Sequence, residues 1–346
     1  MEKKTDIRDI SVEDLQKFCV THKLPKFRSK QVWEWLWKKR AISFDEMTSL
    51  SKIMRDLFAE YFTIKPVKIH KAERSLDGTI KYSLQLHEKL LVEGVLIPSK
   101  KRLTACVSSQ VGCSLACNFC ATGTLKLERN LTAAEIYDQV FILNEEAISN
   151  FGKPLSNIVF MGMGEPLLNY NALLASINLI TTEQGMAISP KRITVSTAGI
   201  SKMIKRLADD EVRFNLAISL HSAINSKRDL LMPINQKINL KELRDSVRYF
   251  YDKTGSRVTY EYILFKDLND TLEDAQMLVQ FAKASPCKIN LIEYNTVESL
   301  SYEKSSNKVT ERFIDYLREK NIITNLRKSK GKDINAACGQ LANKLK

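Results

Sequence analysis

The spacing of apolar positions changes twice along this chain, and each spacing predicts a different kind of structure. From residue 1 to about 64, apolar residues recur every three or four positions, as in FRSKQVWEWLWKKR and MTSLSKIMRDLFAEYF, which predicts a small helical domain. Ser11 followed by Glu13 and Asp14 is typical of a helix N-terminus. From about 65 to 100 the period is two around Asp77-Gly78, which predicts an antiparallel β linker built on a hairpin.

Beyond Lys101 the chain repeats a strand followed by an amphipathic segment. The candidate strands are LTACVSS, NIVFMGMG, RITVSTAG, RFNLAISLHS, RVTYEYILF and KINLIEYN. Six such units predict an α/β fold with a parallel sheet over residues 101–330, either an open doubly wound sheet or an incomplete barrel. In both arrangements ligands bind at the carboxyl ends of the strands. Residues 331–346 are expected to form a C-terminal tail that carries a cysteine.

Composition and charge add an expectation about partners. The 346 residues include 53 Lys and Arg against 40 Asp and Glu, a formal net charge of +13, and 44% are hydrophobic, which excludes a disordered chain. The positive surplus favours an anionic partner, most commonly nucleic acid, and plain solubility is the alternative. No segment approaches the roughly 18 apolar residues of a membrane-spanning helix, and the N-terminus is too charged for a secretory signal. We therefore expect a cytoplasmic protein without a membrane partner.

The tryptophans Trp33, Trp35 and Trp37 all lie in the predicted helical domain, among the lysines and arginines of residues 26–40. An aromatic and basic cluster can bind RNA by stacking on bases and by contacting phosphates. The alternative is that Trp33, Leu36 and Trp37 form the buried face of a short helix. In either case the basic side chains remain free to contact phosphate.

Three of the seven cysteines are crowded on a predicted loop after the first strand of the parallel sheet. Cys113, Cys117 and Cys120 have the spacing CxxxCxxC, which is unlike a secreted disulfide framework. Thiolate ligands suit zinc or an iron–sulfur cluster. A structural zinc site needs a fourth ligand, and the four histidines of this chain are scattered. Three ligands without a fourth favour a cluster with one iron left open to a small molecule.

This motif, with Phe119 before its third cysteine, resembles the signature of the radical S-adenosylmethionine (radical SAM) superfamily. The resemblance implies that the three cysteines bind one [4Fe-4S] cluster whose open iron binds S-adenosylmethionine. In NIVFMGMGEP, Gly164 and Glu165 resemble the element that holds the methionyl amino group, and glycines there allow a ligand to approach the backbone closely. Residues at other predicted strand ends complete the candidate cofactor site: Ser196, Ser219, Leu220, His221 and Asn295.

Two further cysteines, Cys106 and Cys338, point to one family within this superfamily. Together, ACVSSQVGCSLACNFCATG, FMGMGEPLLNY, SLHS, LMPIN and AACGQL resemble the RlmN family of RNA adenine-C2 methyltransferases over nearly the whole chain. The resemblance implies that Cys338 accepts a methyl group, that its methylene radical adds to C2 of adenine, and that Cys106 releases the RNA by forming a transient disulfide. It also implies that Glu93 accepts the C2 proton. Against that role, Gly94 stands where a larger β-former is expected, and a glutamate at a strand end is usually solvated.

The resemblance also implies substrates and partners. The expected substrates are adenine 2503 of 23S rRNA and adenine 37 of tRNA, with two molecules of S-adenosylmethionine used per turnover. A flavodoxin- or ferredoxin-type protein is the expected electron donor, and the expected state is a monomer. Phosphate contacts are expected from the N-terminal domain and from residues 328–332. Two alternatives stay open: a Cfr-like methyltransferase acting on C8 of the same adenine, and a zinc-stabilised RNA-binding protein without catalysis.

Overall fold

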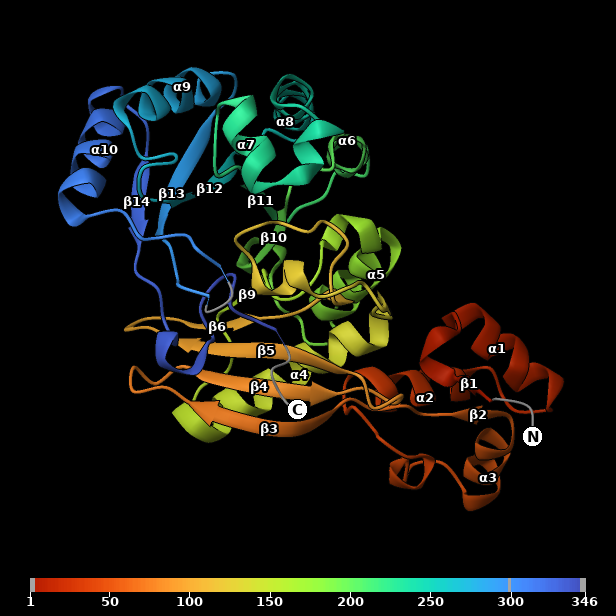
Figure 1. Cartoon of the computed structure of the whole chain (residues 1–346). Helices are drawn as coiled ribbons and strands as arrows, with labels where there is room; N and C mark the ends of the chain where they lie inside the picture. The colour runs from red at the N-terminus through yellow and green to blue at the C-terminus, as the bar shows by residue number, and fades with distance from the viewer. Residues whose placement is uncertain (1–3, 298–299, 343–346) are drawn as a thin grey trace.

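A single ten-stranded sheet runs through the computed structural model, which describes residues 4–297 and 300–342 (Figure 1). Its strands follow the order β14-β13-β12-β11-β10-β9-β6-β5-β4-β3. Neighbouring strands from β6 to β14 are parallel, whereas β3, β4 and β5 pair in antiparallel fashion. The strands are β3 (Lys68–Arg74), β4 (Ile80–Gln85), β5 (Leu91–Pro98), β6 (Leu103–Cys106), β9 (Asn157–Phe160), β10 (Ile193–Thr197), β11 (Asn215–Ser219), β12 (Val258–Leu264), β13 (Cys287–Glu293) and β14 (Thr324–Arg327).

The parallel part of the sheet is an open barrel, which confirms the predicted fold class. The two outer strands of the whole ten-stranded sheet, β14 and β3, are not paired with each other, so the sheet does not close. The six predicted strands are all present, and β14 adds a further parallel strand from the run NIITNLRKSK. Parallel strands place their carboxyl ends at one edge, and this edge carries the site described below.

Helices alternate with the parallel strands, and local sequence sets their ends. Thr132 and Glu135 form a reciprocal capping box at the start of α4, and Gly152 ends that helix in the left-handed conformation. Thr271 caps α9 in the same way through Asp274. The helices of this region are α4 (Ala133–Phe151), α5 (Tyr170–Thr181), α6 (Ser201–Asp209), α7 (Asn225–Leu231), α8 (Leu240–Thr254), α9 (Leu272–Ala282) and α10 (Asn307–Glu319). None of the helices described is both long and apolar enough to cross a membrane.

The predicted β linker is continuous with the barrel sheet, because β5 pairs with β6 from Val95 opposite Cys106 to Pro98 opposite Leu103. Gly94, where a larger residue was expected, faces helix α4. A Cβ atom at this position would lie 3.3 Å from the Cδ1 atom of Leu143. The close approach of α4 to the strand therefore explains the small residue. The predicted domain limits at residues 64, 100 and 330 stay predictions. Residues 1–3 of the predicted N-terminal domain and residues 343–346 of the predicted C-terminal tail lie outside the described residues.

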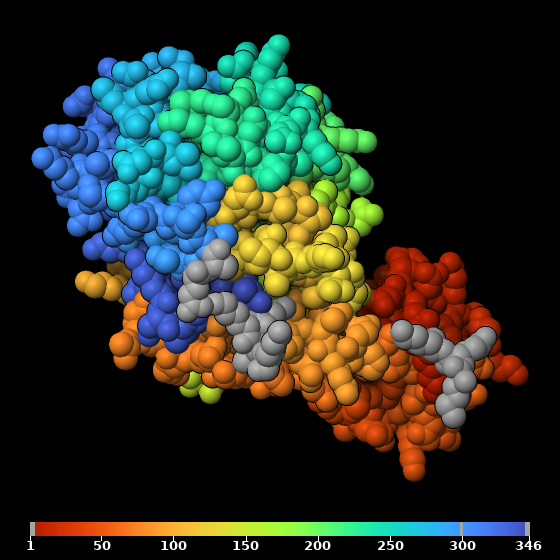
Figure 2. All heavy atoms as spheres, viewed as in Figure 1, coloured from red at the N-terminus to blue at the C-terminus, as the bar shows by residue number. Residues whose placement is uncertain are grey.

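The N-terminal helices lie to one side of the sheet, and Figures 1 and 2 show them projecting beyond the barrel. They are α1 (Val12–Thr21), α2 (Phe27–Trp37) and α3 (Lys52–Tyr61), with β1 (Thr5–Asp6) pairing in parallel with β2 (Phe62–Thr63). Trp37 is buried, and its ring meets Tyr137 of α4 edge-on at 5.2 Å. Leu36 is also buried and Trp33 packs on the core. The structure therefore supports the second interpretation, in which Trp33, Leu36 and Trp37 form the buried face of a helix.

Buried charge also joins this region to the barrel. The Asp138 carboxylate on α4 accepts hydrogen bonds from the Arg8 guanidinium at 2.9 Å and from Arg40 Nε at 3.0 Å. It accepts a third from the Val67 N–H at 2.9 Å. Arg8 also pairs with Asp6 at 2.9 Å. Segments before, within and after the N-terminal helices are therefore all attached to the Asp138 side chain of α4.

Candidate active site

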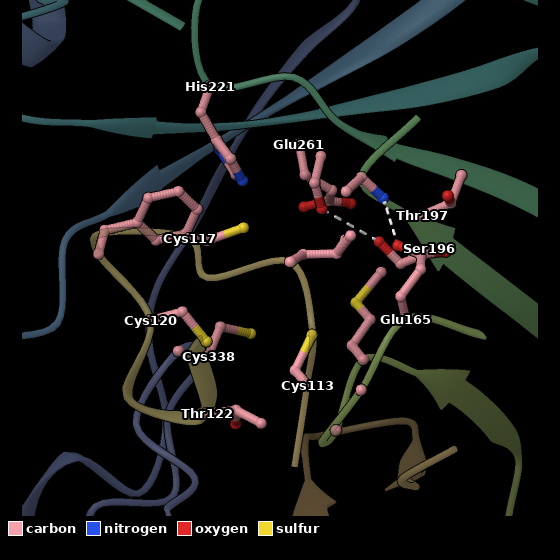
Figure 3. A pocket seen from close by; sticks show the side chains of 18 of the residues that line it. Cys113, Cys117, Cys120, Thr122, Glu165, Ser196, Thr197, His221, Glu261 and Cys338 are labelled. Carbon is pink, nitrogen blue, oxygen red and sulfur yellow. Dashed lines mark hydrogen bonds between the residues drawn. The ribbon is translucent and has the colours of Figure 1, made fainter. Parts of the chain in front are cut away.

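The three cysteines lie on the loop that follows β7 (Gln110–Val111), and they line one cavity at the carboxyl ends of the parallel strands: Cys113, Cys117 and Cys120 (Figure 3). Two neighbours hold this loop. The Asn118 N–H donates to the Leu231 carbonyl at 3.0 Å, and its side chain donates to the Leu230 carbonyl at 2.6 Å. From the C-terminal tail, the Gly339 carbonyl accepts the Ala121 N–H at 2.7 Å. The loop is therefore fixed between α7 and the tail.

Burial keeps the three thiols protonated in the absence of a cation. It raises the pKa of Cys113 to about 11, and it also raises the pKa of Cys117 and of Cys120. The charges of neighbouring cysteines add to the effect at Cys117. A bound metal reverses this preference, because a coordinating thiol loses its proton. The loop thus presents three sulfur ligands, and a bound metal centre would compensate the negative charge of their thiolates.

Glu165 lies beside this loop at the end of β9, and its carboxylate is buried. Oε1 accepts the Leu167 N–H at 3.0 Å and Oε2 accepts the Ala198 N–H at 2.7 Å. Burial raises the pKa of Glu165, while these hydrogen bonds oppose the rise. Each carboxylate oxygen has a second lone pair, so the side chain can still accept a bond from a cationic amino group in the cavity.

The glycines before Glu165 are required by the protein's own packing. A Cβ atom at Gly162 would lie 2.7 Å from the Ser108 Oγ atom, and one at Gly164 would lie 2.5 Å from the Gln110 Cβ atom. Gly164 also has a φ of +95°, which disfavours any residue with a side chain. Both glycines line the cavity, so a ligand can approach them as expected. The close contact with the loop after β6 is the feature that the sequence did not reveal.

Three of the predicted strand-end residues line the same cavity. The hydroxyls of Ser196 on β10 and Ser219 on β11 lie 3.4 Å apart. His221 accepts the Ile263 N–H on Nδ1 at 3.1 Å, so its neutral ring carries the proton on Nε2. Burial, together with the charge of Arg228, lowers the pKa of His221 to about 3. The cavity therefore offers two hydroxyls and one neutral N–H donor in addition to the Glu165 carboxylate, and Figure 3 shows Ser196 beside Glu165.

The other two predicted cofactor contacts do not line this cavity. Leu220 is completely buried, and its carbonyl accepts a hydrogen bond from Arg228 Nε at 3.1 Å. Asn295 donates from Nδ2 to the Cys338 carbonyl at 3.2 Å, while its buried Oδ1 has no hydrogen-bond partner among the described residues. Leu220 thus packs behind the site, and Asn295 holds the tail that carries Cys338.

Cys338 lies where two cavities meet. Its side chain lines the cavity of the cysteine loop and also a second cavity, which Cys106 lines as well. Arg327 of β14 also lines both cavities, and its Nη2 atom lies 3.7 Å from the Cys338 Sγ atom. The two cysteines are 232 positions apart in the sequence, yet the fold places them on one cavity.

Glu93 is buried in the middle of β5 and does not line either cavity. Its Oε2 atom accepts the Ala342 N–H at 2.8 Å, and its Oε1 atom lies 3.5 Å from Lys81 Nζ. The expectation that a glutamate here is solvated is wrong, since the tail covers it. The carboxylate binds the backbone four residues after Cys338.

Comparison with known proteins supports the arrangement of this site. A family model described as "Radical SAM superfamily" matches residues 107–282, and one described as "Ribosomal RNA large subunit methyltransferase N-terminal domain" matches residues 5–64. A probable dual-specificity RNA methyltransferase RlmN from Christiangramia forsetii is 53% identical over 99% of this chain and 97% of its own. The corresponding protein from Flavobacterium psychrophilum is 52% identical, over 99% and 98% of the two chains. The chain belongs to the RlmN family.

The fold of this RlmN family member also matches that of a solved structure. The crystal structure of a radical SAM methyltransferase from Sphaerobacter thermophilus is 36% identical to it, covers 97% of this chain and 99% of its own, and superposes with a TM-score of 0.91. The predicted class of enzyme, an S-adenosylmethionine-dependent RNA methyltransferase, is confirmed. The zinc-stabilised protein without catalysis is the alternative that these comparisons exclude.

Radical SAM enzymes, RlmN family members among them, use a [4Fe-4S] cluster and S-adenosylmethionine, and the donor set here fits both groups. Three thiols on one loop line a cavity whose opposite wall holds a buried carboxylate and two hydroxyls. In the described part of the chain, no three His, Cys, Asp or Glu side chains converge closely enough to hold a single metal ion. In a cluster each cysteine binds a different iron, so such convergence is not required.

Sequence reasoning missed two residues of this RlmN family site, Glu261 and Arg327. Glu261 of β12 is buried, lines the first cavity and accepts a hydrogen bond from Arg327 Nη1 at 3.0 Å. Glu261 lies within the largely apolar strand VTYEYIL, and Arg327 is the last residue of the mostly polar strand TNLR. The sequence offered one signal for Glu261, a charged residue inside an apolar strand. For Arg327 it offered no signal of a functional role beyond the basic run that follows it.

Proposed function

We propose that this enzyme methylates C2 of adenine in 23S rRNA and in tRNA, using Cys338 as a methyl carrier and Cys106 as the resolving thiol. The observation that carries the proposal is the position of Cys338 between the two cavities. One cavity has the donors that fit the cluster and S-adenosylmethionine, and the other is lined by Cys106 and by basic residues. A carrier must reach both a donor and an acceptor, and Cys338 borders both spaces.

The cluster, with S-adenosylmethionine bound, supplies the one-electron chemistry that converts a methyl group on sulfur into a reactive carbon. Cys113, Cys117 and Cys120 would hold the cluster, and Glu165 would bind the methionyl ammonium. Ser196, Ser219 and His221 would contact the remaining polar groups of S-adenosylmethionine, with His221 donating from Nε2. The Cys338 thiolate first attacks the methyl carbon of one S-adenosylmethionine. A carbon–sulfur bond to Cys338 forms as the bond to the sulfonium breaks, and S-adenosylhomocysteine leaves.

Cys106 ends the reaction. In the protein–RNA adduct, the methylene carbon would join the Cys338 sulfur to C2 of adenine. The ring would recover its aromatic bonding when C2 loses its proton to the base and one electron returns to the oxidised cluster. The Cys106 thiolate then forms a bond to the Cys338 sulfur while the carbon–sulfur bond breaks. The electron pair of that bond stays with the carbon, which takes up a proton and becomes the methyl group. The two thiols are oxidised to a disulfide, and an external thiol must reduce it before the next turnover.

Glu93 is the proposed acceptor of the C2 proton. A buried carboxylate that binds the backbone of the tail is held near the residue that carries the RNA, although it borders neither cavity. A movement of the tail around the adduct would release its Oε2 atom from Ala342. Lys81, 3.5 Å from Oε1, keeps a positive charge beside it.

RNA binding is proposed for the basic rim of the second cavity and for the N-terminal domain. Lys328, Ser329 and Lys330 line that cavity together with the two cysteines. Lysine ammonium groups at a cavity mouth suit the phosphates on either side of an unstacked base. In the N-terminal domain, Lys39 lies over the Trp35 ring at 3.8 Å. We also propose that the protein works as a monomer in the cytoplasm and receives its electron from a flavodoxin- or ferredoxin-type protein.

The proposal is tested with anaerobically reconstituted enzyme, ribosomal RNA fragments and S-adenosylmethionine. The parent protein should show one added methyl group on the peptide containing Cys338 and should produce C2-methyladenosine, identified by mass spectrometry against C2 and C8 standards. Cys338→Ala should abolish both results while keeping the iron content. Cys106→Ala should accumulate a covalent protein–RNA species, and Cys287→Ala, which changes a thiol outside both cavities, should behave as the parent.

Four outcomes would each contradict part of the proposal. C8-methyladenosine as the product would replace it with the Cfr-like activity. Normal turnover by Cys338→Ala would exclude that residue as carrier, and turnover without an adduct in Cys106→Ala would exclude the resolving role. Glu93→Gln, which preserves the hydrogen bond from Ala342, should keep the methylated Cys338 peptide but lose product, whereas full activity would exclude Glu93 as the base.

A further inference from the structure

Arg228 is a buried cation that the proposed reaction does not use. It lies on α7, the helix whose last residues hold the cysteine loop at Asn118, and it is only 1% exposed. Its Nε atom donates to the Leu220 carbonyl at 3.1 Å, and its Nη1 atom donates to the Asn235 Oδ1 atom at 2.9 Å. Its Nη2 atom donates to the Ala198 carbonyl at 2.7 Å. The guanidinium therefore joins the ends of β10 and β11 to the segment after α7.

All of these acceptors are neutral. A buried charge costs free energy unless an opposite charge compensates it, and arginine seldom lies in an interior without a carboxylate partner. No carboxylate of the described residues forms an ion pair with Arg228 within 4.0 Å. Burial lowers the pKa of Arg228 to about 10, and negative charge at Cys117 and at Asp229 opposes that fall. The side chain is thus a cation at neutral pH. It lies directly behind the wall of the cavity that Cys117 lines, because Ala198 and Ser219 line that cavity and their carbonyls lie 2.7 and 3.4 Å from Nη2.

We infer that Arg228 is the buried counter-ion of the iron–sulfur cluster and raises its reduction potential. The inference rests on the proposed role of Cys117 as a cluster ligand. Reduction adds one electron, and hence one negative charge, to the cluster. A fixed cation stabilises the reduced form more than the oxidised form, and the effect is large where water is excluded. Arg228 acts on the cluster through its charge and touches no reacting atom, so it is a positioning residue.

The test is a redox titration of the reconstituted proteins with dithionite, followed by visible absorbance and without S-adenosylmethionine. Arg228→Gln keeps hydrogen-bonding groups but removes the charge, and it should lower the equilibrium constant for reduction at least tenfold, which is 59 mV for one electron. Arg228→Lys keeps the charge and should retain most of the potential. The control is Arg248→Gln, which removes an exposed cation paired with Asp252 on α8 and should leave the potential unchanged.

A second variant keeps the test decisive if Arg228→Gln does not fold. Asp229→Asn removes a carboxylate that partly offsets Arg228, so it should raise the potential. A loaded Arg228→Gln protein with the parent potential would overturn the inference, as would an unchanged potential in Asp229→Asn. A parent protein that binds neither iron nor sulfide would instead overturn the proposed ligand role of the cysteines, so the two failures are distinguishable.

Discussion

At the scale of single residues, the two thiols that border the second cavity differ in their surroundings. Cys106 is buried between β5 and β9, and burial, reinforced by the charge of Cys338, raises its pKa to about 12. Cys338 lies 3.7 Å from a guanidinium nitrogen of Arg327, which an ion pair with Glu261 holds in place. The sulfur proposed to accept the methyl group thus has a cation beside it, whereas burial holds the proposed resolving sulfur as a neutral thiol.

This difference predicts a steep pH dependence for alkylation of Cys106. Because the thiolate is the reactive form, a rise in pKa from 9.0 to about 12 lowers the thiolate fraction about a thousandfold at pH 8. Iodoacetamide labelling of the native protein should therefore be slow at pH 8 and rise about tenfold per pH unit up to pH 11. Peptide mass spectrometry measures the rate, and Cys287, whose pKa burial raises to about 11, should label about tenfold faster. Equal rates in native and urea-unfolded protein at pH 8 would contradict this assignment.

At the scale of the elements, the site depends on close contacts between the loops that follow adjacent strands. Gly162 and Gly164 after β9 lie against Ser108 and Gln110 after β6. The Glu165 N–H also donates to Gln110 Oε1 at 2.7 Å. The carboxylate of Glu165 then reaches across to the end of β10. Three consecutive parallel strands are thereby tied together at their carboxyl ends, directly beneath the cavity.

Gly164→Ala should consequently be more destabilising than an ordinary substitution at a positive φ. A Cβ atom would lie 2.5 Å from Gln110 in addition to the conformational strain, so we expect a loss of roughly 2–4 kcal/mol in the free energy of unfolding. Gly255, at a helix end with a φ of +64° and no atom within 4 Å of an added Cβ, is the matched control. Its change to alanine should cost about 1 kcal/mol. Urea titration measures both, and equal losses would mean that the loop contact carries no stability.

At the scale of the whole molecule, the N-terminal helices are joined to the barrel by one buried acid. Asp138 binds Arg8, which precedes α1, and also Arg40 and the Val67 N–H, which follow α2 and α3. The helical domain is thus held at both of its ends. Since phosphate contacts are proposed both there and at Lys328 and Lys330, this junction sets the distance between the two RNA-binding surfaces.

Asp138→Asn should loosen the junction. Removing the charge of Asp138 leaves the Arg40 guanidinium without its carboxylate partner and leaves Arg8 paired with Asp6 alone. Breaking a buried ion pair in this way costs about 3–5 kcal/mol. We expect faster proteolysis between residues 38 and 68 and weaker RNA binding, with the iron content unchanged. Asp252→Asn, which breaks an exposed pair with Arg248, should cost less than about 1 kcal/mol. Parental proteolysis and RNA affinity in Asp138→Asn would show that the Asp138 network does not position the helices.

The sequence by itself determined the order of strands and helices, the cysteine motif and the family, because these depend on local periodicity and on spacing within short segments. It also indicated that Cys106 and Cys338 matter, but only through their likeness to a family. Only the tertiary structure decided that Leu220 and Asn295 lie outside the first cavity, that Glu93 is covered by the tail, and that Arg327 stands beside Cys338. These facts depend on which segments distant in the sequence come into contact, and no local pattern of polar and apolar residues encodes such contacts.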